Sequence, residues 1–248
     1  MISLKSRREI QTIREAAEIL RKVFVKVKPE VRAGITTDDL DQMAETVIRE
    51  SGGEPAFKGY RGFPKTACIS LNEEVVHGIP GKRKLKEGDM VSFDIGAKVN
   101  GYYADAARTW MVGEPTAVQK KLIETARGSL MAGLEKYRPG CRIGDFSEAI
   151  QRHIEAQGFQ VVRDYVGHGI GRMIHEDPQV PNYGRAGLGP KIEPGLVLAI
   201  EPMVTEGHYA VETLKDGWTV VTRDRKLSSH YEDTIAFTEK GYEILTGE

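Results

Sequence analysis

The chain has 248 residues, a formal net charge of −1 and 40% hydrophobic residues, which is ample apolar material for one large domain or two small ones. Its charges are well mixed, which argues against a nucleic-acid surface or a tail that attracts a basic partner. The N-terminus lacks the apolar core of a signal peptide, and no run reaches the roughly 18 apolar residues of a membrane span. Two cysteines, Cys68 and Cys141, make no disulfide framework. These observations predict a soluble cytoplasmic protein.

Two helices are predicted at the start of the chain. Ser6 and Glu9 have the spacing of a capping box, and apolar residues then recur with helical periodicity. A second helix is predicted after residues 36–39, whose Thr and Asp side chains suit a helix start. Gly52 and Gly53 would end this helix before the first strands.

A hairpin is predicted over residues 91–109, around the Asn-Gly turn at 100–101. Because successive side chains of a strand point to opposite faces, the turn decides which residues share a face. Pairing outward from the turn sets Gly96 opposite Asp105. Asp94 and Asp105 then become diagonal neighbours on one face, with backbones roughly 7–8 Å apart.

These two aspartates are a candidate cation site. Two carboxylates on a mostly apolar hairpin repel each other and lose hydration unless a cation lies between them. The alternative is one solvated Asp and one buried, hydrogen-bonded Asp. We favour the cation, because Asp94 lies within the run Met-Val-Ser-Phe-Asp-Ile, which is typical of a buried strand.

The second half of the chain resembles the first. It has its own capping box at 116–119, and each half contains a strand with a glycine followed six residues later by a carboxylate, at 88–94 and 195–201. Chance similarity is the alternative. A true repeat predicts one α+β domain with pseudo-twofold halves, about 1–113 and 114–248, and helices packed on a curved, mostly antiparallel sheet. The matched helix positions are Gly34, Leu40, Ala44, Ile48 and Gly52 with Gly140, Phe146, Ile150, Ile154 and Gly158.

Two further candidate acids come from the second half. Glu201 ends the apolar run Leu-Val-Leu-Ala-Ile-Glu, where a lone buried carboxylate would be costly. Glu232 follows a hairpin predicted around residues 223–226. The polar neighbours of Glu232 leave open the alternative that it faces solvent, as most Glu side chains do.

Three histidines are candidates for chemistry, although a single histidine is more often structural. His168 lies in the run Gly-His-Gly-Ile-Gly at 167–171, whose glycines would let a ligand approach closely. His77 follows an apolar strand, and His175 follows His168 at a spacing unlike that of helical zinc motifs. A dinucleotide site fails on the glycine spacing and on the absence of a following helix. We interpret His153, His208 and His230 as structural.

Four carboxylates with one histidine make an oxygen-rich set, which suits Mn²⁺, Fe²⁺ or Co²⁺ better than a thiolate-type zinc site does. Four carboxylates exceed what one ion needs, so two bridged divalent ions are predicted, roughly 3.5–4 Å apart. A water between two such ions ionises near neutral pH and becomes a nucleophile. The predicted chemistry is metal-assisted hydrolysis.

At these positions the sequence resembles the type I methionine aminopeptidases, metallopeptidases with the pita-bread fold. The resemblance extends from the first helix to the closing strand, and six motifs occur in order. They are Gly-Phe-Pro-Lys-Thr-Ala-Cys-Ile-Ser (62–70), Asn-Glu-Glu-Val-Val-His-Gly-Ile-Pro (72–80), Asp94 with Asp105, Gly-His-Gly-Ile-Gly (167–171), Ile-Glu-Pro-Met (200–203) and Tyr-Glu-Asp-Thr (231–234).

The resemblance implies two divalent metal ions per chain, drawn from Co, Mn, Fe and Zn. Asp105 and Glu232 would bridge both ions, Asp94 would bind one, and His168 and Glu201 the other. Glu201 would also be the general base for a hydroxide that lies between the ions and attacks the first peptide bond.

The resemblance also implies the substrate contacts. His175 would hydrogen-bond the scissile carbonyl and stabilise the oxyanion, and His77 would position the peptide backbone. Relatives often have Tyr at the position of Phe63, a Cys near Phe57 and Phe at the position of Ile174. These differences keep the wall of the substrate pocket apolar but change the shape of the pocket. Core packing is the alternative for the aromatics. The pocket for the methionine side chain would consist of Tyr60, Phe63, Cys68, Ile174 and Trp218, with Phe57 beside them.

The implied activity is removal of the initiator methionine from nascent proteins whose second residue is small, by a monomer that meets its substrates at the ribosome. A prolidase-like peptidase of the same fold is one alternative, but such relatives usually carry an extra N-terminal domain, for which the residues before Ser6 leave no room. A binding protein that has lost its metals is the other. It would have no electrostatic reason to keep four clustered acids.

Overall fold

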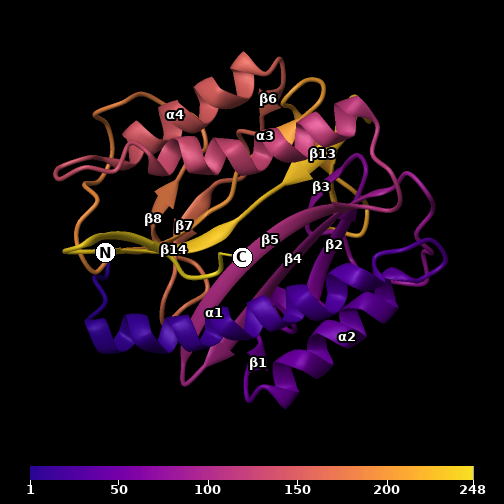
Figure 1. Ribbon diagram of the computed structural model, residues 1–248, viewed down its shortest axis with the longest axis horizontal. Coiled ribbons are helices and arrows are strands. Elements are labelled where there is room, and N and C mark those ends of the chain that lie inside the picture. The colour runs from indigo at the N-terminus through magenta and orange to yellow at the C-terminus, as the bar shows by residue number, and fades with distance from the viewer. Residues whose placement is uncertain (248) are drawn as a thin grey trace.

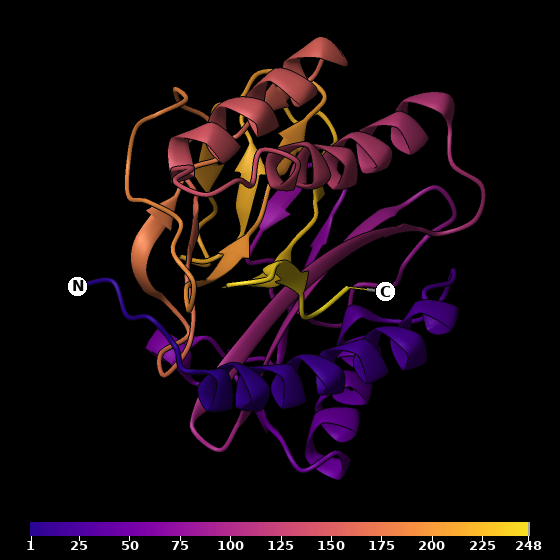
Figure 2. The same ribbon diagram turned by 60° about the vertical axis from the view of Figure 1, so that its left-hand side comes forward.

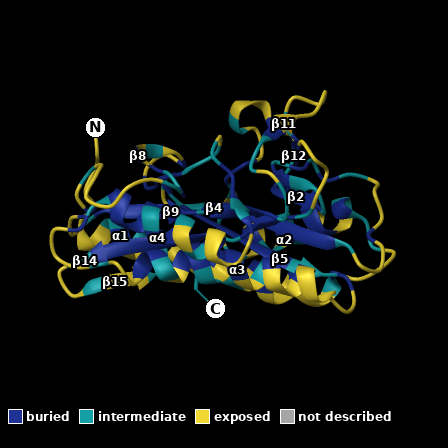
Figure 3. Ribbon diagram, turned by 90° about the horizontal axis from the view of Figure 1, so that it is seen from above, coloured by how far each residue is buried: buried dark blue, intermediate teal, exposed yellow. Residues whose placement is uncertain are grey.

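The computed structural model describes residues 1–247. Figure 1 shows two helix pairs at opposite sides of the molecule, with the strands between them. Seen from above, the helices form one layer and strands β8, β11 and β12 lie on the other side (Figure 3). None of the helices within residues 1–247 is long and apolar enough to cross a membrane. The helices are α1 (Arg7–Val27), α2 (Thr37–Glu50), α3 (Ala117–Leu134) and α4 (Ile143–Ala156), with single 3-10 turns at Lys28–Glu30 and Tyr60–Gly62.

The strands of residues 1–247 pair antiparallel throughout and form four sheets. Together with the helices they confirm the predicted α+β class. The sheets are β1 (Glu54–Pro55), β2 (Ala67–Leu71), β4 (Met90–Val99) and β5 (Tyr102–Met111); β3 (Glu74–Val76), β11 (Val211–Thr213) and β12 (Val220–Thr222); β6 (Gln160–Val161), β10 (Met203–Thr205) and β13 (Ser228–His230); and β7 (Gly167–Gly169), β8 (Glu176–Val180), β9 (Val197–Ile200), β14 (Asp233–Thr238) and β15 (Gly241–Ile244).

The predicted capping boxes are confirmed at both helix starts. The Ser6 hydroxyl accepts from the backbone N–H of Glu9, and the Glu9 carboxylate accepts from the backbone N–H of Ser6. Thr116 and Gln119 make the same reciprocal pair at the start of α3. Each box satisfies N–H groups that have no partner inside the helix, which fixes where the helix begins.

The predicted hairpin is confirmed in its turn and its register. Asn100 and Gly101 have φ values of 48° and 81°, as a type I′ turn requires at both central positions. Beyond the turn, Gly96 pairs with Asp105 and Asp94 pairs with Ala107. Asp94 and Asp105 are therefore diagonal neighbours on one face, as the turn position predicted.

Two large hydrophobic clusters lie against the helix pairs, and each draws most of its residues from one half of the chain. Phe24 of α1 packs edge-on against Phe93 and Trp110 in the first cluster. Beneath α3 and α4, Phe146 and Phe237 pack together in a second cluster. Helices α2 and α4 have the same length, and the repeat of the two halves stays a prediction.

The hairpin predicted around residues 223–226 is wrong. The chain does turn there, where the Arg225 N–H donates to the Thr222 carbonyl at 3.1 Å. However, β12 pairs with β11 and β3, whereas β13 pairs with β10. Strands β12 and β13 therefore belong to different sheets, and the turn connects those two sheets just before Glu232.

Candidate metal centre

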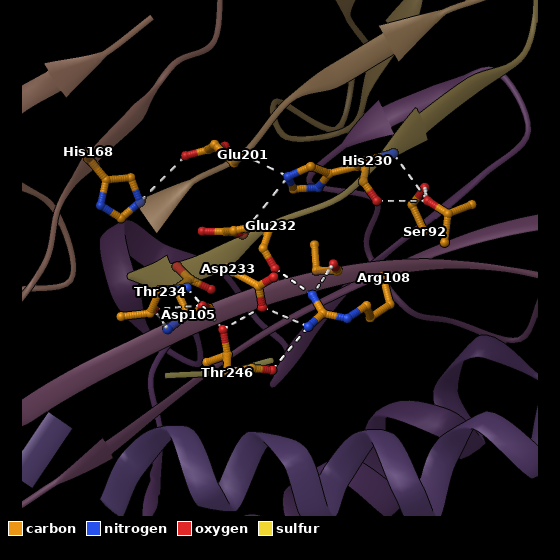
Figure 4. A network of polar contacts seen from close by, with 12 residues as sticks. Ser92, Asp105, Arg108, His168, Glu201, His230, Glu232, Asp233, Thr234 and Thr246 are labelled. Atoms are coloured by element: carbon orange, nitrogen blue, oxygen red, sulfur yellow. Dashed lines mark hydrogen bonds and ion pairs between the residues drawn. The ribbon is translucent and has the colours of Figure 1, made fainter. Parts of the chain in front are cut away.

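The five predicted ligands lie around one cavity of about 390 Å³. Asp94 and Asp105 come from β4 and β5, His168 from β7, Glu201 from the residue after β9, and Glu232 from the residue before β14. Each therefore lies on a strand or at a strand end, where backbone pairing restricts its position. Figure 4 shows four of them converging from separate strands.

Strand pairing brings the two halves of the chain together at this point. His168 pairs with Ala199 and Asp233 pairs with Ile200, so β7 and β14 flank β9, the strand that Glu201 directly follows. A β-bridge between Ala107 and Glu232 joins the hairpin to this sheet. The Glu232 N–H donates to the Ala107 carbonyl at 3.0 Å, and the Ala107 N–H donates to the Glu232 carbonyl at 3.3 Å. The acids of the first half consequently face those of the second half.

The ligand atoms are close enough to share a metal ion. One atom each from Asp105, His168 and Glu232 lies within 4.8 Å of the others, and all three side chains are buried. His168 Nε2 lies 3.6 Å from Glu201 Oε1. His168 Nδ1 is 3.0 Å from the Gly169 carbonyl oxygen, and donation there would leave Nε2 free to face the acids.

The electrostatics of the cluster favour a cation. Burial raises the pKa of Asp105 from 3.8 to about 7. Burial, with the charge of Asp105 as the next cause, raises the pKa of Asp94, Glu201 and Glu232 well above their ordinary values. Burial also lowers the pKa of His168 to about 3, which leaves the imidazole neutral and able to bind a metal. Without a cation, this set of acids would have to hold protons near neutral pH.

Unpaired oxygens give a second test of the fit to a metal. Oδ1 of Asp94, Oδ1 of Asp105 and Oε1 of Glu232 are buried and have no hydrogen-bond partner. Buried carboxylate oxygens without a donor are rare, because each loses its hydration without compensation. Cation coordination would satisfy all three, and the oxygen-rich donor set suits a hard divalent ion.

A supporting network behind the acids was missed from the sequence. The Thr234 hydroxyl accepts from the Asp105 N–H at 2.9 Å and donates to the Asp105 carbonyl at 2.8 Å. Buried Arg108 donates to the Glu232 carbonyl at 2.5 Å and to Asp233 Oδ1 at 2.7 Å (Figure 4). Thr234 and Asp233 lie in the Tyr-Glu-Asp-Thr motif, so that motif was the available signal for them.

His230, which we interpreted as structural from the sequence, is buried beside the acids. Its Nε2 lies 3.9 Å from one oxygen of Glu201 and 3.9 Å from one oxygen of Glu232 (Figure 4). These distances are too long for hydrogen bonds. Burial lowers the pKa of His230 to about 3, so the ring is neutral there.

The two histidines predicted to contact substrate both line the cavity. His175 Nδ1 is 2.9 Å from the Tyr60 hydroxyl, and its ring centroid is 4.3 Å from that of His168. His77 packs edge-on against Tyr165 and Trp218. Burial lowers the pKa of His77 to about 4, and partial burial together with the Arg61 charge lowers that of His175.

The residues predicted for the methionine pocket form one apolar cluster next to the acids. Ile174 lies in this cluster although it does not line the cavity, and the sulfur of Cys68 stays protonated because burial raises its pKa well above 9.0. An apolar wall beside a polar, metal-compatible floor is typical of a small-molecule or peptide-end site. The cluster comprises Ala56, Phe57, Phe63, Cys68 and Ile174, with Tyr60 and Trp218 packed against it.

Comparison with known proteins identifies the class to which this fold and site belong. The family model described as metallopeptidase family M24 matches residues 11–239. A methionine aminopeptidase from Clostridium perfringens is 53% identical over 99% of both chains. The crystal structure of a methionine aminopeptidase from Thermotoga maritima has a TM-score of 0.97 and 45% identity over 100% of both chains. A prolidase from Pyrococcus furiosus has a TM-score of 0.81 and 25% identity, over 99% of this chain and 65% of the prolidase.

The chain is therefore a metallopeptidase of family M24, with the pita-bread fold that the motifs predicted. Within that family it belongs to the methionine aminopeptidases. Membership of this family implies the use of divalent metal, which agrees with the unpaired oxygens and the buried acids of the cavity.

Proposed function

We propose that this chain removes the initiator methionine from nascent proteins whose second residue is small. Two divalent ions would be held by Asp94, Asp105, His168, Glu201 and Glu232. The observation that carries the proposal is the convergence of four acids, three of them buried and with an unpaired oxygen, on a cavity with an apolar wall. Four carboxylates offer more negative charge than one divalent ion requires.

When bound, the pair of ions supplies a water that ionises near neutral pH. Glu201, at the cavity floor 3.6 Å from His168, would accept the proton of that water and pass it to the leaving amine. Nε2 of His175 would donate a hydrogen bond to the scissile carbonyl, because Tyr60 engages the other ring nitrogen. His77 would hold the peptide backbone, and its lowered pKa supports a neutral ring in that role.

The apolar cluster of Phe57, Phe63, Cys68 and Ile174 supports methionine as the first residue, because it offers an unbranched thioether a dry contact surface. The free N-terminal amine of the peptide would lie at the ions, which limits cleavage to the first bond. We place the enzyme in the cytoplasm as a monomer, acting on chains that emerge from the ribosome.

The test is turnover of Met-Ala-Ser by the apoprotein refilled with Mn²⁺, Fe²⁺, Co²⁺ and Zn²⁺ in turn, with metal content measured in parallel. Activity that peaks at two ions per chain is expected, as is much slower cleavage of Met-Leu-Ser. Cleavage of Ala-Pro-Pro in preference to Met-Ala-Ser would instead support a prolidase-like activity. That alternative is tested because the prolidase has the same fold. Absence of bound metal and of turnover would contradict the proposal.

A further inference from the structure

Lys5, in the segment before α1, is buried where a lysine is rarely found. Its side chain is 2% exposed, and its Nζ lies 2.5 Å from Oε2 of Glu176, whose side chain is 7% exposed. The same ammonium donates to the Ser3 carbonyl at 2.9 Å. Lysine and glutamate are almost never this buried unless they are paired, so the contact holds two distant segments together. Figure 2 shows the N-terminal segment passing the second half of the chain before it enters α1.

Two glycines make room for this lysine. A Cβ at Gly171 would collide with Lys5 Cε and would lie 2.9 Å from Oε1 of Glu176. Gly195 has a φ of +94°, accepts the Lys5 N–H at 2.6 Å, and would place a Cβ 2.9 Å from the Lys5 carbonyl oxygen. The ion pair therefore gives a reason for the last glycine of the Gly-His-Gly-Ile-Gly motif.

Glu176 in turn closes the loop that carries His175. Its Oε1 accepts the backbone N–H of Met173 at 3.1 Å, and the Gly171 N–H donates to the Met173 carbonyl at 3.1 Å. His175 directly precedes Glu176, and Ile174 of the apolar cluster precedes His175. One carboxylate therefore fixes the backbone on which the proposed oxyanion donor and a wall of the pocket are placed.

We infer that Lys5 is a positioning residue for His175, acting through Glu176. This inference rests on the proposed function. Tyr60 holds one ring nitrogen of His175, but it cannot fix the backbone from which the ring projects. Without Lys5 the Glu176 carboxylate would be buried without a cation and would turn toward water, which would move the adjacent His175. A displacement of about 1 Å from the reacting carbonyl is enough to cost roughly a hundredfold in rate.

The test compares Lys5→Met with Lys98→Met in the metal-loaded enzyme. Lys98 also pairs with a glutamate, Glu54, but at 3.2 Å and with side chains 29% and 66% exposed, so it controls for the loss of an ordinary ion pair. For Lys5→Met we expect kcat on Met-Ala-Ser to fall by roughly tenfold to a hundredfold, with KM and calorimetric metal affinity within about twofold of the parent. Lys98→Met should match the parent.

The decisive arm repeats Lys5→Met in a His175→Ala background. If Lys5 acts through His175, adding Lys5→Met to His175→Ala should leave the rate of His175→Ala unchanged. An equal fall in both backgrounds, or an unchanged rate in the parent background, would overturn the inference while leaving the proposed function intact. No turnover by the parent protein would overturn both. Should Lys5→Met fail to fold, Lys5→Met with Glu176→Gln removes both charges, and the same comparison with His175→Ala applies.

Discussion

Asp105→Asn is expected to make the metal-free protein more stable while abolishing its response to metal. Burial raises the pKa of Asp105 from 3.8 to about 7, so the native protein binds a proton that the unfolded chain has already lost. The stability of the apoprotein therefore falls as the pH rises from about 4 to about 7. At pH 7.5 the raised pKa of this group costs the apoprotein on the order of 2–4 kcal/mol.

The asparagine keeps the shape of the side chain and removes its charge. We therefore expect the chelated variant to gain about 2–4 kcal/mol at pH 7.5, or roughly 5–15 °C in Tm for a chain of this length. Near pH 4 most of the gain should disappear, because the aspartate is then largely protonated in the unfolded chain as well as in the native protein. Thermal or urea unfolding of both proteins after chelation measures the difference, and a second series with Mn²⁺ should stabilise the parent alone. Hydrolysis of Met-Ala-Ser by the variant should be lost.

Asp216→Asn is the matched control. Asp216 does not line the cavity of the acids, and it accepts the N–H groups of Trp218 and Thr219. Its hydrogen bonds to Thr219 and Trp218 lower its pKa in spite of partial burial. Its replacement should destabilise the protein. The reasoning would be refuted if chelated Asp105→Asn were less stable than the parent at pH 7.5, or if Mn²⁺ still stabilised it.

The remaining predictions concern the histidines and the pH. His175→Ala should lower kcat by roughly 10²–10³, as loss of an oxyanion donor does, and weakened metal binding in its place would contradict the assigned role. Calorimetric metal affinity should rise between pH 5.5 and 7.5, because acids with raised pKa values release protons when metal binds; a flat profile would contradict this. Gly167→Ala should weaken metal binding. A Cβ at Gly167 would collide with the carbonyl of Ala199, the residue that pairs with His168, and would displace the strand that carries His168. Unchanged metal affinity would show that this strand contact is not needed.

Local sequence signals predicted local structure well. The Asn-Gly pair at 100–101 requires left-handed backbone at both positions, and that requirement alone fixes the register of the hairpin and the face of Asp94. The turn at 223–226 shows the limit of such signals. A turn specifies that the chain reverses, but the partner of the next strand is decided by distant residues, here Met203–Thr205.

The candidate site was predictable where burial of a charge would be costly without compensation. Asp94 and Glu201 stand out because each interrupts an apolar run. Lys5 and Arg108 carry no comparable signal, since a lone cation in a mixed segment is usually solvated. Their partners Glu176 and Asp233 lie more than a hundred residues away along the chain, and only the fold brings them together. The pocket residues, likewise, followed from the family resemblance and not from any local pattern.

The bridge between Ala107 and Glu232 has a consequence for biosynthesis. Asp94 and Asp105 are translated early, whereas their counterpart Glu232 emerges only after more than half of the chain has been added. A ribosome that makes this protein therefore carries an incomplete cluster until Glu232 has left the exit tunnel. If Glu232 binds metal as proposed, the site cannot be complete while the last residues of the chain are still being added.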